Sequence, residues 1–194
     1  MGNFRPIETF YNGYKFRSRL EARWSIFFDS LNIKYEYEPE GFVLSDGTRY
    51  LPDFYLPQSD SFFEVKGIMT DIDKHKVEQF IRDIGKPVTI GYGDMTFQAC
   101  DNWGSDGYEL TDSDSSHLCR CYQCNNYFFM GNGGSYQCPC CGYYDGDSTA
   151  EWCAEGHLID RDQYITNDVY QAFLKSKQAR FEHGETPINI KYIY

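Results

Sequence analysis

The sequence predicts an α/β fold with a mixed sheet flanked by helices, followed by a small cysteine-rich module and a C-terminal helix. Helical and strand-like patterns follow one another over residues 1–99 in the order helix, three strands, helix and strand. Two Cys-x-x-Cys pairs then occur within residues 117–147. At 194 residues, the chain is long enough for one ordinary domain and a small module.

The first predicted elements are a hairpin and a helix. Residues 9–16 contain a central Asn-Gly pair between two aromatic runs, which is a strong hairpin signal. Ser18 and Glu21 form the capping-box pattern that begins a helix, and Asn32 is suited to end it. Its apolar face recurs at helical spacing and consists of Leu20, Trp24, Phe27, Phe28 and Leu31.

Three strands are expected next. Residues 34–38 alternate in polarity, and residues 41–44 are predicted to continue the same strand. An Asp-Gly turn then leads into a strand over residues 49–57, which is rich in aromatic and branched side chains. Residues 62–67 are its predicted hairpin partner, with the turn at residues 58–61.

A second helix is expected from Thr70 to about Ile84, because Thr70 is a capping residue and Gly85 can end the helix. A further strand is predicted over residues 87–92. The expected buried side of this helix consists of Ile72, His75, Val77, Phe80, Ile81 and Ile84.

The predicted hairpin carries two acids and a lysine in a pattern that favours metal binding. Side chains alternate along a strand, so Glu64 and Lys66 share one face while Val65 faces the core. Asp53 lies opposite them on the neighbouring strand. Two close carboxylates repel unless a cation lies between them, and hard oxygen ligands select Mg²⁺ or Mn²⁺. The alternative is a solvated strand face without chemistry.

Pro52-Asp53 followed by Glu64-Val65-Lys66 resembles the signature of the PD-(D/E)-x-K nuclease superfamily. The spacing from Glu21 to Asp53 to Glu64 is also similar to that of phage endonuclease I-type junction resolvases. No clear Gln-x-x-x-Tyr motif follows the lysine strand, so the RecB-like branch is less favoured. The chain also resembles a group of uncharacterised phage and bacterial nuclease-like proteins. This resemblance lies in residues 16–24, 35–42, 51–57 and 179–185.

The resemblance implies a restriction-endonuclease-like core and metal-dependent hydrolysis of DNA, in the processing of phage or mobile-element DNA. Asp53, Glu64 and the backbone carbonyl of Val65 would hold one or two Mg²⁺ or Mn²⁺ ions. Lys66 would orient or deprotonate the attacking water, either through a lowered pKa or as a fixed ammonium. Glu21, from the first helix, would complete the site through a water. A capping role alone also explains Glu21.

The net charge of −11 restricts how the chain can bind nucleic acid, because such proteins are usually basic. Residues 1–99 carry 12 Lys and Arg against 15 Asp and Glu, whereas residues 100–194 carry 6 against 14. DNA binding therefore needs a local basic rim, and Arg17, Arg19 and Arg23 are the candidates for phosphate contacts. Their alternative is an ordinary solvated helix end.

The acidic second half supports another class of function. In this alternative, the chain is a non-catalytic binding protein whose acidic surface meets a protein partner or imitates DNA, with the cysteine-rich module as the docking element. Residues 100–116 are part of this surface and are expected to form an acidic linker or loop.

The cysteine spacing indicates a zinc ribbon over residues 117–147. Two Cys-x-x-Cys pairs separated by 13 residues fit a tetrahedral thiolate site, and Cys-Pro-x-Cys-Gly is a tight knuckle that points backbone amides at sulfur. A hairpin with a turn at residues 131–134 fits between the pairs. The predicted zinc ligands are Cys121, Cys124, Cys138 and Cys141.

The sequence also allows other zinc ligands. Cys119, Cys140 and His117 lie close enough in sequence to replace one of the four. Cys100 and Cys153 are interpreted as packed thiols outside the site. Disulfides are the alternative, but the start of the chain shows no secretion signal.

Residues 148–194 are predicted to form a C-terminal helix and tail. The helix is expected from Thr166 to Phe181, with Gly184 after it and an edge strand over residues 188–194 that returns to the sheet. No apolar run reaches the length of a membrane span, which favours a cytoplasmic protein, in a host cell if phage-encoded. The oligomeric state, including a homodimer, stays open.

Overall fold

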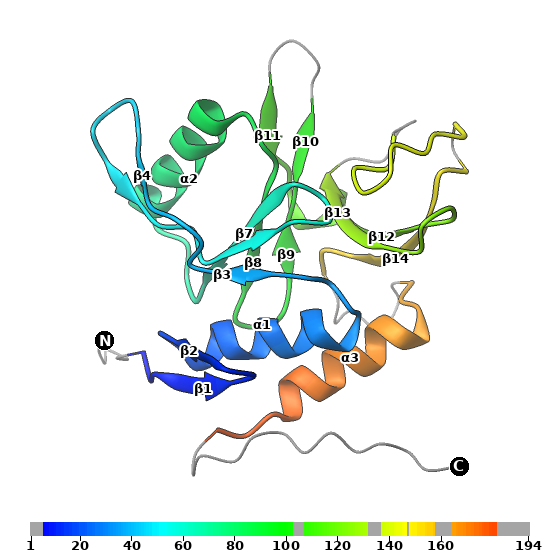
Figure 1. The fold of residues 1–194 in the computed structure, drawn as a ribbon, viewed down its shortest axis with the longest axis horizontal. Coiled ribbons are helices and arrows are strands. Elements are labelled where there is room, and N and C mark those ends of the chain that lie inside the picture. Colours follow the sequence, from blue (N-terminus) through cyan, green and yellow to red (C-terminus); the bar gives the residue numbers. More distant parts are fainter. Residues whose placement is uncertain (1–5, 103–106, 132–136, 147, 158–163, 182–194) are drawn as a thin grey trace.

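The computed structural model describes residues 6–102, 107–131, 137–146, 148–157 and 164–181. Over these residues the fold is mixed α/β, with three α-helices, a mixed five-stranded sheet and a three-stranded sheet (Figure 1). The predicted α/β class is therefore confirmed. None of the described helices is long and apolar enough to cross a membrane.

The hairpin and first helix form where they were predicted, but only the Ser18 half of the capping box is present. The Glu21 carboxylate instead accepts the Arg17 N–H and the Ser18 hydroxyl. Strands β1 (Thr9–Tyr11) and β2 (Tyr14–Phe16) pair antiparallel, and helix α1 spans Arg19–Ser30. Ser18 caps the helix by accepting the Glu21 backbone N–H at 3.1 Å. Asn32 follows the helix with a left-handed φ of 56°. The fully buried face includes Trp24, Phe27 and Phe28.

The main sheet has the strand order β3-β6-β7-β8-β9. The strands are β3 (Glu36–Tyr37), β6 (Phe54–Leu56), β7 (Ser61–Lys66), β8 (Val88–Tyr92) and β9 (Phe97–Gln98). Only β7 and β8 pair in parallel within this sheet, and helix α2 (Asp71–Ile84) supplies the crossover between them.

The two helices cover opposite faces of this sheet. Phe63 and Val65 of β7 share a core with α1, whereas Phe62 shares a second core with α2. Because side chains alternate along β7, Glu64 and Lys66 lie on the same side as Phe62. Gly91 of β8 permits this packing, since a Cβ there would lie 2.5 Å from the Phe63 ring and 2.6 Å from Trp24.

Two segments that were each predicted as one continuous strand are broken into two shorter strands. Residues 34–44 do not form one strand, because Glu38 takes a left-handed φ of 46° before Pro39. The second piece, β4 (Phe42–Val43), instead pairs with β5 (Arg49–Tyr50) in a separate sheet. The predicted strand over 49–57 is interrupted at residues 51–53, since Pro52 has no N–H to donate to a ladder. Asp53 therefore lies directly before β6.

Helix α2 has the predicted ends and a narrower buried side than expected. Thr70 and Asp73 form a capping box, and Gly85 ends the helix with φ 66°. Val77, Phe80 and Ile81 are buried, but Ile72 is 70% exposed and the His75 side chain is 64% exposed. Val77 is the first residue of this helix in the core that it forms with the sheet, so the first turn does not contribute to that core. Ile84 is partly buried against the same core.

The segment expected as a linker carries secondary structure. Strands β10 (Cys100–Asn102) and β11 (Tyr108–Leu110) pair antiparallel, and a 3-10 turn follows at Ser113–Ser115. Cys100 is buried in the core beneath α2, as expected of a packed thiol.

The cysteine-rich region is built on three strands. These are β12 (Ser116–Cys121), β13 (Tyr127–Gly131) and β14 (Ala150–Glu155), in the order β13-β12-β14. The predicted hairpin between the cysteine pairs was therefore only partly right, because β13 pairs back with β12 rather than within that interval. Residues 132–134 of the predicted turn lie outside the described residues.

One hydrophobic core joins this sheet to the rest of the molecule. Leu118, Tyr127 and Cys153 belong to the same buried cluster as the apolar face of α1. The Phe129 ring lies 5.2 Å from Phe63 and 5.0 Å from Phe97 between ring centroids. The three-stranded sheet thus packs directly against the main sheet.

Helix α3 (Asn167–Gln178) lies beside α1 (Figure 1). Its buried side includes Val169, Ala172 and Phe173, which join the core that contains α1. The helix ends at Gln178 rather than at the predicted Phe181. Gly184 and the predicted strand over 188–194 lie outside the described residues.

Candidate functional site

The residues predicted for metal chemistry meet in one open cleft of about 460 Å³. The cleft lies where the start of α1, the residues before β6, the end of β7 and the start of α2 come together. Its lining includes Arg17, Glu21, Asp53, Glu64, Val65 and Lys66. The sequence predicted this gathering of side chains from residues that are up to 49 positions apart.

Asp53 is fixed by bonds across the hairpin. Its backbone N–H donates to Glu64 Oε2 at 3.2 Å, and its Oδ2 accepts the Val65 N–H at 2.7 Å. Its Oδ1 accepts from Arg17 Nη2 at 2.6 Å. Asp53 and Glu64 are each only 4% exposed. Both acids are therefore held rigidly, and Val65 contributes a backbone N–H while its carbonyl remains a predicted ligand.

Lys66 is tied to the same acids. Its Nζ lies 2.6 Å from Glu64 Oε1 and 3.8 Å from Asp73 Oδ1. Burial favours the neutral amine, but the charges of Glu64, Asp53 and Asp73 outweigh burial and raise the pKa of Lys66. In this arrangement Lys66 is a fixed ammonium, which corresponds to the second of its two predicted roles.

Glu21 is buried and accepts three hydrogen bonds. Its Oε1 accepts the Ser18 hydroxyl at 2.7 Å, and its Oε2 accepts the Arg17 N–H at 3.0 Å and the Tyr37 hydroxyl at 2.6 Å. The helix cap and the cleft therefore share this carboxylate. Sequence reasoning missed Tyr37, although its place on an alternating strand marked it as a residue with a defined face.

Tyr50 is a second residue of the cleft that the sequence did not single out. Its hydroxyl is buried close to the Glu64 carboxylate. Burial raises the pKa of Tyr50 most, and the charge of nearby Glu64 raises it further.

The cleft is lined by four acids and four cations, but three of the acids are buried, whereas the cations are half-buried or exposed. Burial raises the pKa of Asp53 well above its ordinary value, and Glu64 and Glu21 raise it further. The Val65 N–H and the Arg17 guanidinium lower this pKa without offsetting the other effects. A divalent cation would relieve the repulsion between these carboxylate oxygens.

The positions of the acids restrict which of them can hold one ion directly. Across the described residues, the only group of three or more side-chain ligand atoms mutually within 4.8 Å is the cysteine cluster. Opposite ligands of one Mg²⁺ lie about 4.2 Å apart. Glu21, Asp53 and Glu64 are thus too far apart to bind one ion together as they stand.

The raised pKa of Asp53 makes stability depend on pH in a defined direction. A carboxyl whose pKa is higher in the folded chain adds stability at low pH and loses it as pH rises through that pKa. We expect Asp53→Asn, which cannot ionise, to gain melting temperature relative to wild type as pH rises from acid to neutral. Melting curves without added Mg²⁺ measure this difference, and a difference that is constant with pH contradicts the raised pKa.

The four predicted zinc ligands form a compact cluster. Cys121, Cys124, Cys138 and Cys141 place their sulfur atoms within 4.8 Å of one another. The Cys121–Cys141 and Cys124–Cys138 sulfur distances are 3.8 and 3.9 Å. A tetrahedral site with Zn–S bonds of 2.3 Å has S–S edges of about 3.8 Å, whereas a disulfide bond measures about 2.0 Å. The cluster can therefore hold a metal ion such as zinc.

Both cysteine turns have the knuckle geometry. Asn125 and Gly142, which follow the second cysteine of each pair, have φ values of 57° and 76°. The Gln123 N–H donates to Cys121 Sγ at 3.3 Å, and backbone amides of Cys140 and Cys141 face the Cys138 sulfur. These amides stabilise thiolates, which are the metal-binding form.

The alternative ligands lie elsewhere. Cys119 is fully buried on β12 between its two partner strands, and Cys140 Sγ approaches the Tyr127 carbonyl at 3.9 Å. The His117 ring stacks on Trp152 with centroids 4.2 Å apart. None of the three belongs to the described cluster.

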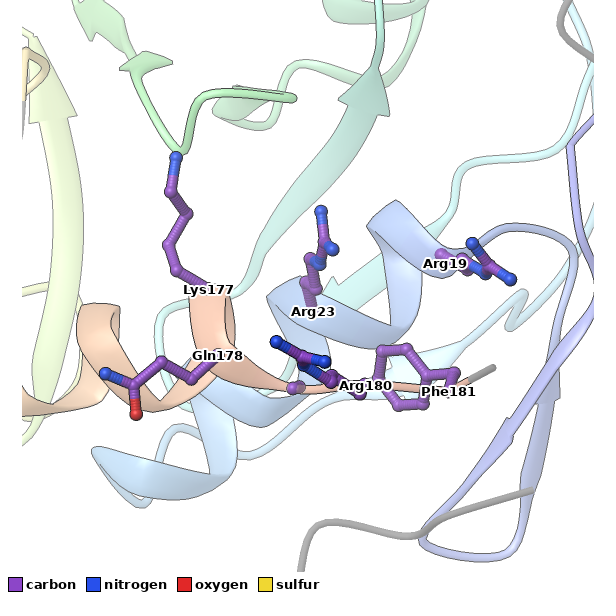
Figure 2. Close-up of a pocket in the computed structure, with 7 residues that line it drawn as sticks. Arg19, Arg23, Lys177, Gln178, Arg180 and Phe181 are labelled. Atoms are coloured by element: carbon purple, nitrogen blue, oxygen red, sulfur yellow. The ribbon is translucent and has the colours of Figure 1, made fainter. Parts of the chain in front are cut away.

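The three candidate phosphate-binding arginines divide between two places. Arg17 lies in the cleft, where it pairs with Asp53 at 2.6 Å and with Glu38 at 2.5 Å. Arg19 and Arg23 instead line a groove between α1 and the end of α3, shown in Figure 2. The predicted single rim is thus two separate surfaces, because Arg17 precedes the helix.

Comparison with known proteins adds no family. No protein-family model matches the chain, and no curated protein matches it.

Proposed function

We propose that this protein is a Mg²⁺-dependent or Mn²⁺-dependent deoxyribonuclease with a PD-(D/E)-x-K core and a structural zinc ribbon. The observation that carries the proposal is the buried pair Asp53 and Glu64, with Lys66 on the same face as Glu64 and Glu21 beside them. The Asp53 N–H donates to the Glu64 carboxylate, and the Val65 N–H donates to the Asp53 carboxylate. Burying two carboxylates together costs free energy of desolvation, and such a pair is expected where a cation binds.

Each residue of the cleft has a role in this proposal. Asp53 and Glu64, with the carbonyl of Val65, would hold the metal, which when bound supplies a water of lowered pKa and neutralises phosphate charge. Lys66 donates from a fixed ammonium to an oxygen of the reacting phosphate or its attacking water. Arg17, whose side chain is 53% exposed, can exchange Asp53 for a phosphate oxygen of DNA.

Cleavage of supercoiled plasmid tests the proposal. We expect purified protein to nick or linearise plasmid with Mg²⁺ or Mn²⁺ and to leave it intact with Ca²⁺ alone or with no divalent ion. Absence of cleavage by zinc-loaded protein over a range of DNA structures, including single strands and junctions, would contradict it.

Glu21→Gln separates the capping role of Glu21 from its proposed role in the metal site. The amide keeps the size of the side chain and can still accept from Tyr37 or Ser18, so we expect stability to change by at most about 1 kcal/mol. Loss of the negative charge should abolish most cleavage in Mg²⁺, with partial recovery in Mn²⁺. Melting temperature and plasmid cleavage are the two readouts.

Ser18→Ala is the matched control, because it removes the cap and one of the three hydrogen bonds to the Glu21 carboxylate but leaves the Glu21 charge. We expect this variant to lose about 1 kcal/mol of stability and to retain cleavage. Full activity of Glu21→Gln would remove Glu21 from the metal site and leave it as a helix cap.

A binding protein is the second candidate function, and one observation favours it. Arg17 and Lys66 already pair with Asp53 and Glu64, so the acids are partly neutralised without a metal. In that case the acidic second half would meet a protein partner or imitate DNA. Such a protein has no need of Mg²⁺, so divalent-metal affinity discriminates between the two.

A further inference from the structure

A basic groove lies between the start of α1 and the end of α3, on helices that are far apart in the sequence. Figure 2 shows Arg19 and Arg23 on α1 beside the segment that ends α3. The groove has a volume of about 730 Å³ and carries four cationic side chains, with Gln178 and Phe181 at its edge. The cations are Arg19, Arg23, Lys177 and Arg180.

Among the described residues, the lining of this groove contains no acid, although the whole chain has a net charge of −11. Within the described residues, Arg23 and Arg180 make no ion pair, and the buried Nε of Arg23 has no hydrogen-bond partner. Arg23, Lys177 and Arg180 surround one space with like charges that repel one another, so an anion in the groove would be favoured.

Lys177 is the cation with other neighbours. Its Nζ lies 5.5 Å from the centroid of the Phe173 ring. Burial alone would raise the pKa of Asp94, but hydrogen bonds from Thr96 and, to a smaller extent, the charge of Lys177 lower it. The two arginines Arg23 and Arg180 are therefore the stronger anion contacts, because a guanidinium can bind a phosphate through two parallel N–H groups.

The groove and the acidic cleft lie on opposite sides of one helix. Arg19 and Arg23 are four residues apart and share a face of α1, whereas Glu21, between them, projects from the other face. A helix with side chains is about 10 Å thick, and phosphates along a DNA strand advance about 3.4 Å per nucleotide. A strand that passes over α1 therefore reaches the groove about three nucleotides from the cleft.

We propose that this groove binds the phosphate backbone of the DNA substrate, about three or more nucleotides from the bond in the acidic cleft. That the bound phosphates belong to DNA rests on the proposed nuclease function. Helix α3 then contributes to substrate binding as well as to the core, and the substrate must be longer than a dinucleotide to engage it.

Binding without cleavage tests the proposal. All variants carry Asp53→Asn, and affinity for a labelled DNA duplex is measured by fluorescence anisotropy without divalent ions over a series of salt concentrations. We expect Arg23→Gln with Arg180→Gln to weaken binding at least about tenfold and to reduce the salt slope by about 1.8, which is 0.9 for each lost phosphate contact. Affinity for a dinucleotide should not change.

Two further variants make the result specific. Lys177→Gln with Arg180→Gln, both at exposed positions on or just after α3, should also weaken binding and does not alter the half-buried Arg23. Lys34→Gln with Arg82→Gln removes the same charge outside the groove and should leave affinity and slope near those of the parent protein.

Equal affinity of the groove variants and the Lys34 and Arg82 control would overturn the proposal, as would absence of salt-dependent binding by the parent. Cleavage by wild type is scored separately. A wild type that cleaves DNA while groove variants bind normally refutes the groove alone. Groove variants that lose affinity beside an inactive wild type refute the nuclease assignment alone.

Discussion

Asp53→Asn will lower DNA cleavage in Mg²⁺ by roughly three orders of magnitude or more while the protein stays folded. The amide has the size of the carboxylate and can still accept the Val65 N–H, but it lacks the charge that a divalent cation requires. Because the charged form of Asp53 is disfavoured in the folded state, melting temperature at neutral pH should be unchanged or raised.

Asp60→Asn is the matched control for this change. Asp60 lies on the turn of the same hairpin, outside the cleft, and has a φ of 48° that Asn also tolerates. Its Oδ1 lies 2.6 Å from Lys86 Nζ. Cleavage should remain near wild type. An Asp53→Asn protein that is destabilised but active would show that Asp53 is structural.

Cys141→Ser will remove the metal from the cysteine cluster and unfold the sheet that carries it. Cys141 is the exposed member of the four, so the change costs little packing and acts mainly through the lost thiolate. Protein purified without added metal should contain about one Zn²⁺ per chain, and the variant close to none. Structural zinc sites in isolated fingers contribute about 10 kcal/mol, so a large fall in melting temperature is expected.

Cys140→Ser is the matched control, one position earlier and outside the cluster. It should retain zinc and most of the stability. Metal analysis and thermal melting of both variants measure whether Cys141, and not Cys140, is a zinc ligand. If Cys121→Ser keeps full zinc, then Cys119 is the ligand and the knuckle assignment is wrong.

Local signals in the sequence were sufficient for much of the fold and for both clusters. Capping residues and periodicity predicted α1 and α2 closely, because these signals act over a few residues. Cys-x-x-Cys spacing predicted the sulfur cluster, since each knuckle is a local turn. Alternation along β7 placed Glu64 and Lys66 on one face without knowledge of the rest of the chain.

The parts that could not be predicted depend on contacts between distant segments. The pairing of β14 with β12 makes the cysteine region part of a three-stranded sheet, and Phe129 joins that sheet to Phe63. Nothing near Arg23 in sequence indicates that Arg180 will lie across a groove from it. Pro52 could have been recognised as a break in its strand, because it lacks a ladder N–H.

The central claim is that the buried acids of the cleft hold a divalent metal. Titration of zinc-loaded wild type with Mg²⁺ and with Mn²⁺ by isothermal calorimetry, beside Asp53→Asn and Asp60→Asn, tests it most directly. We predict that wild type and Asp60→Asn bind with equal affinity and that Asp53→Asn loses most of the binding. No heat of binding by wild type, or equal affinity of Asp53→Asn, would contradict the claim.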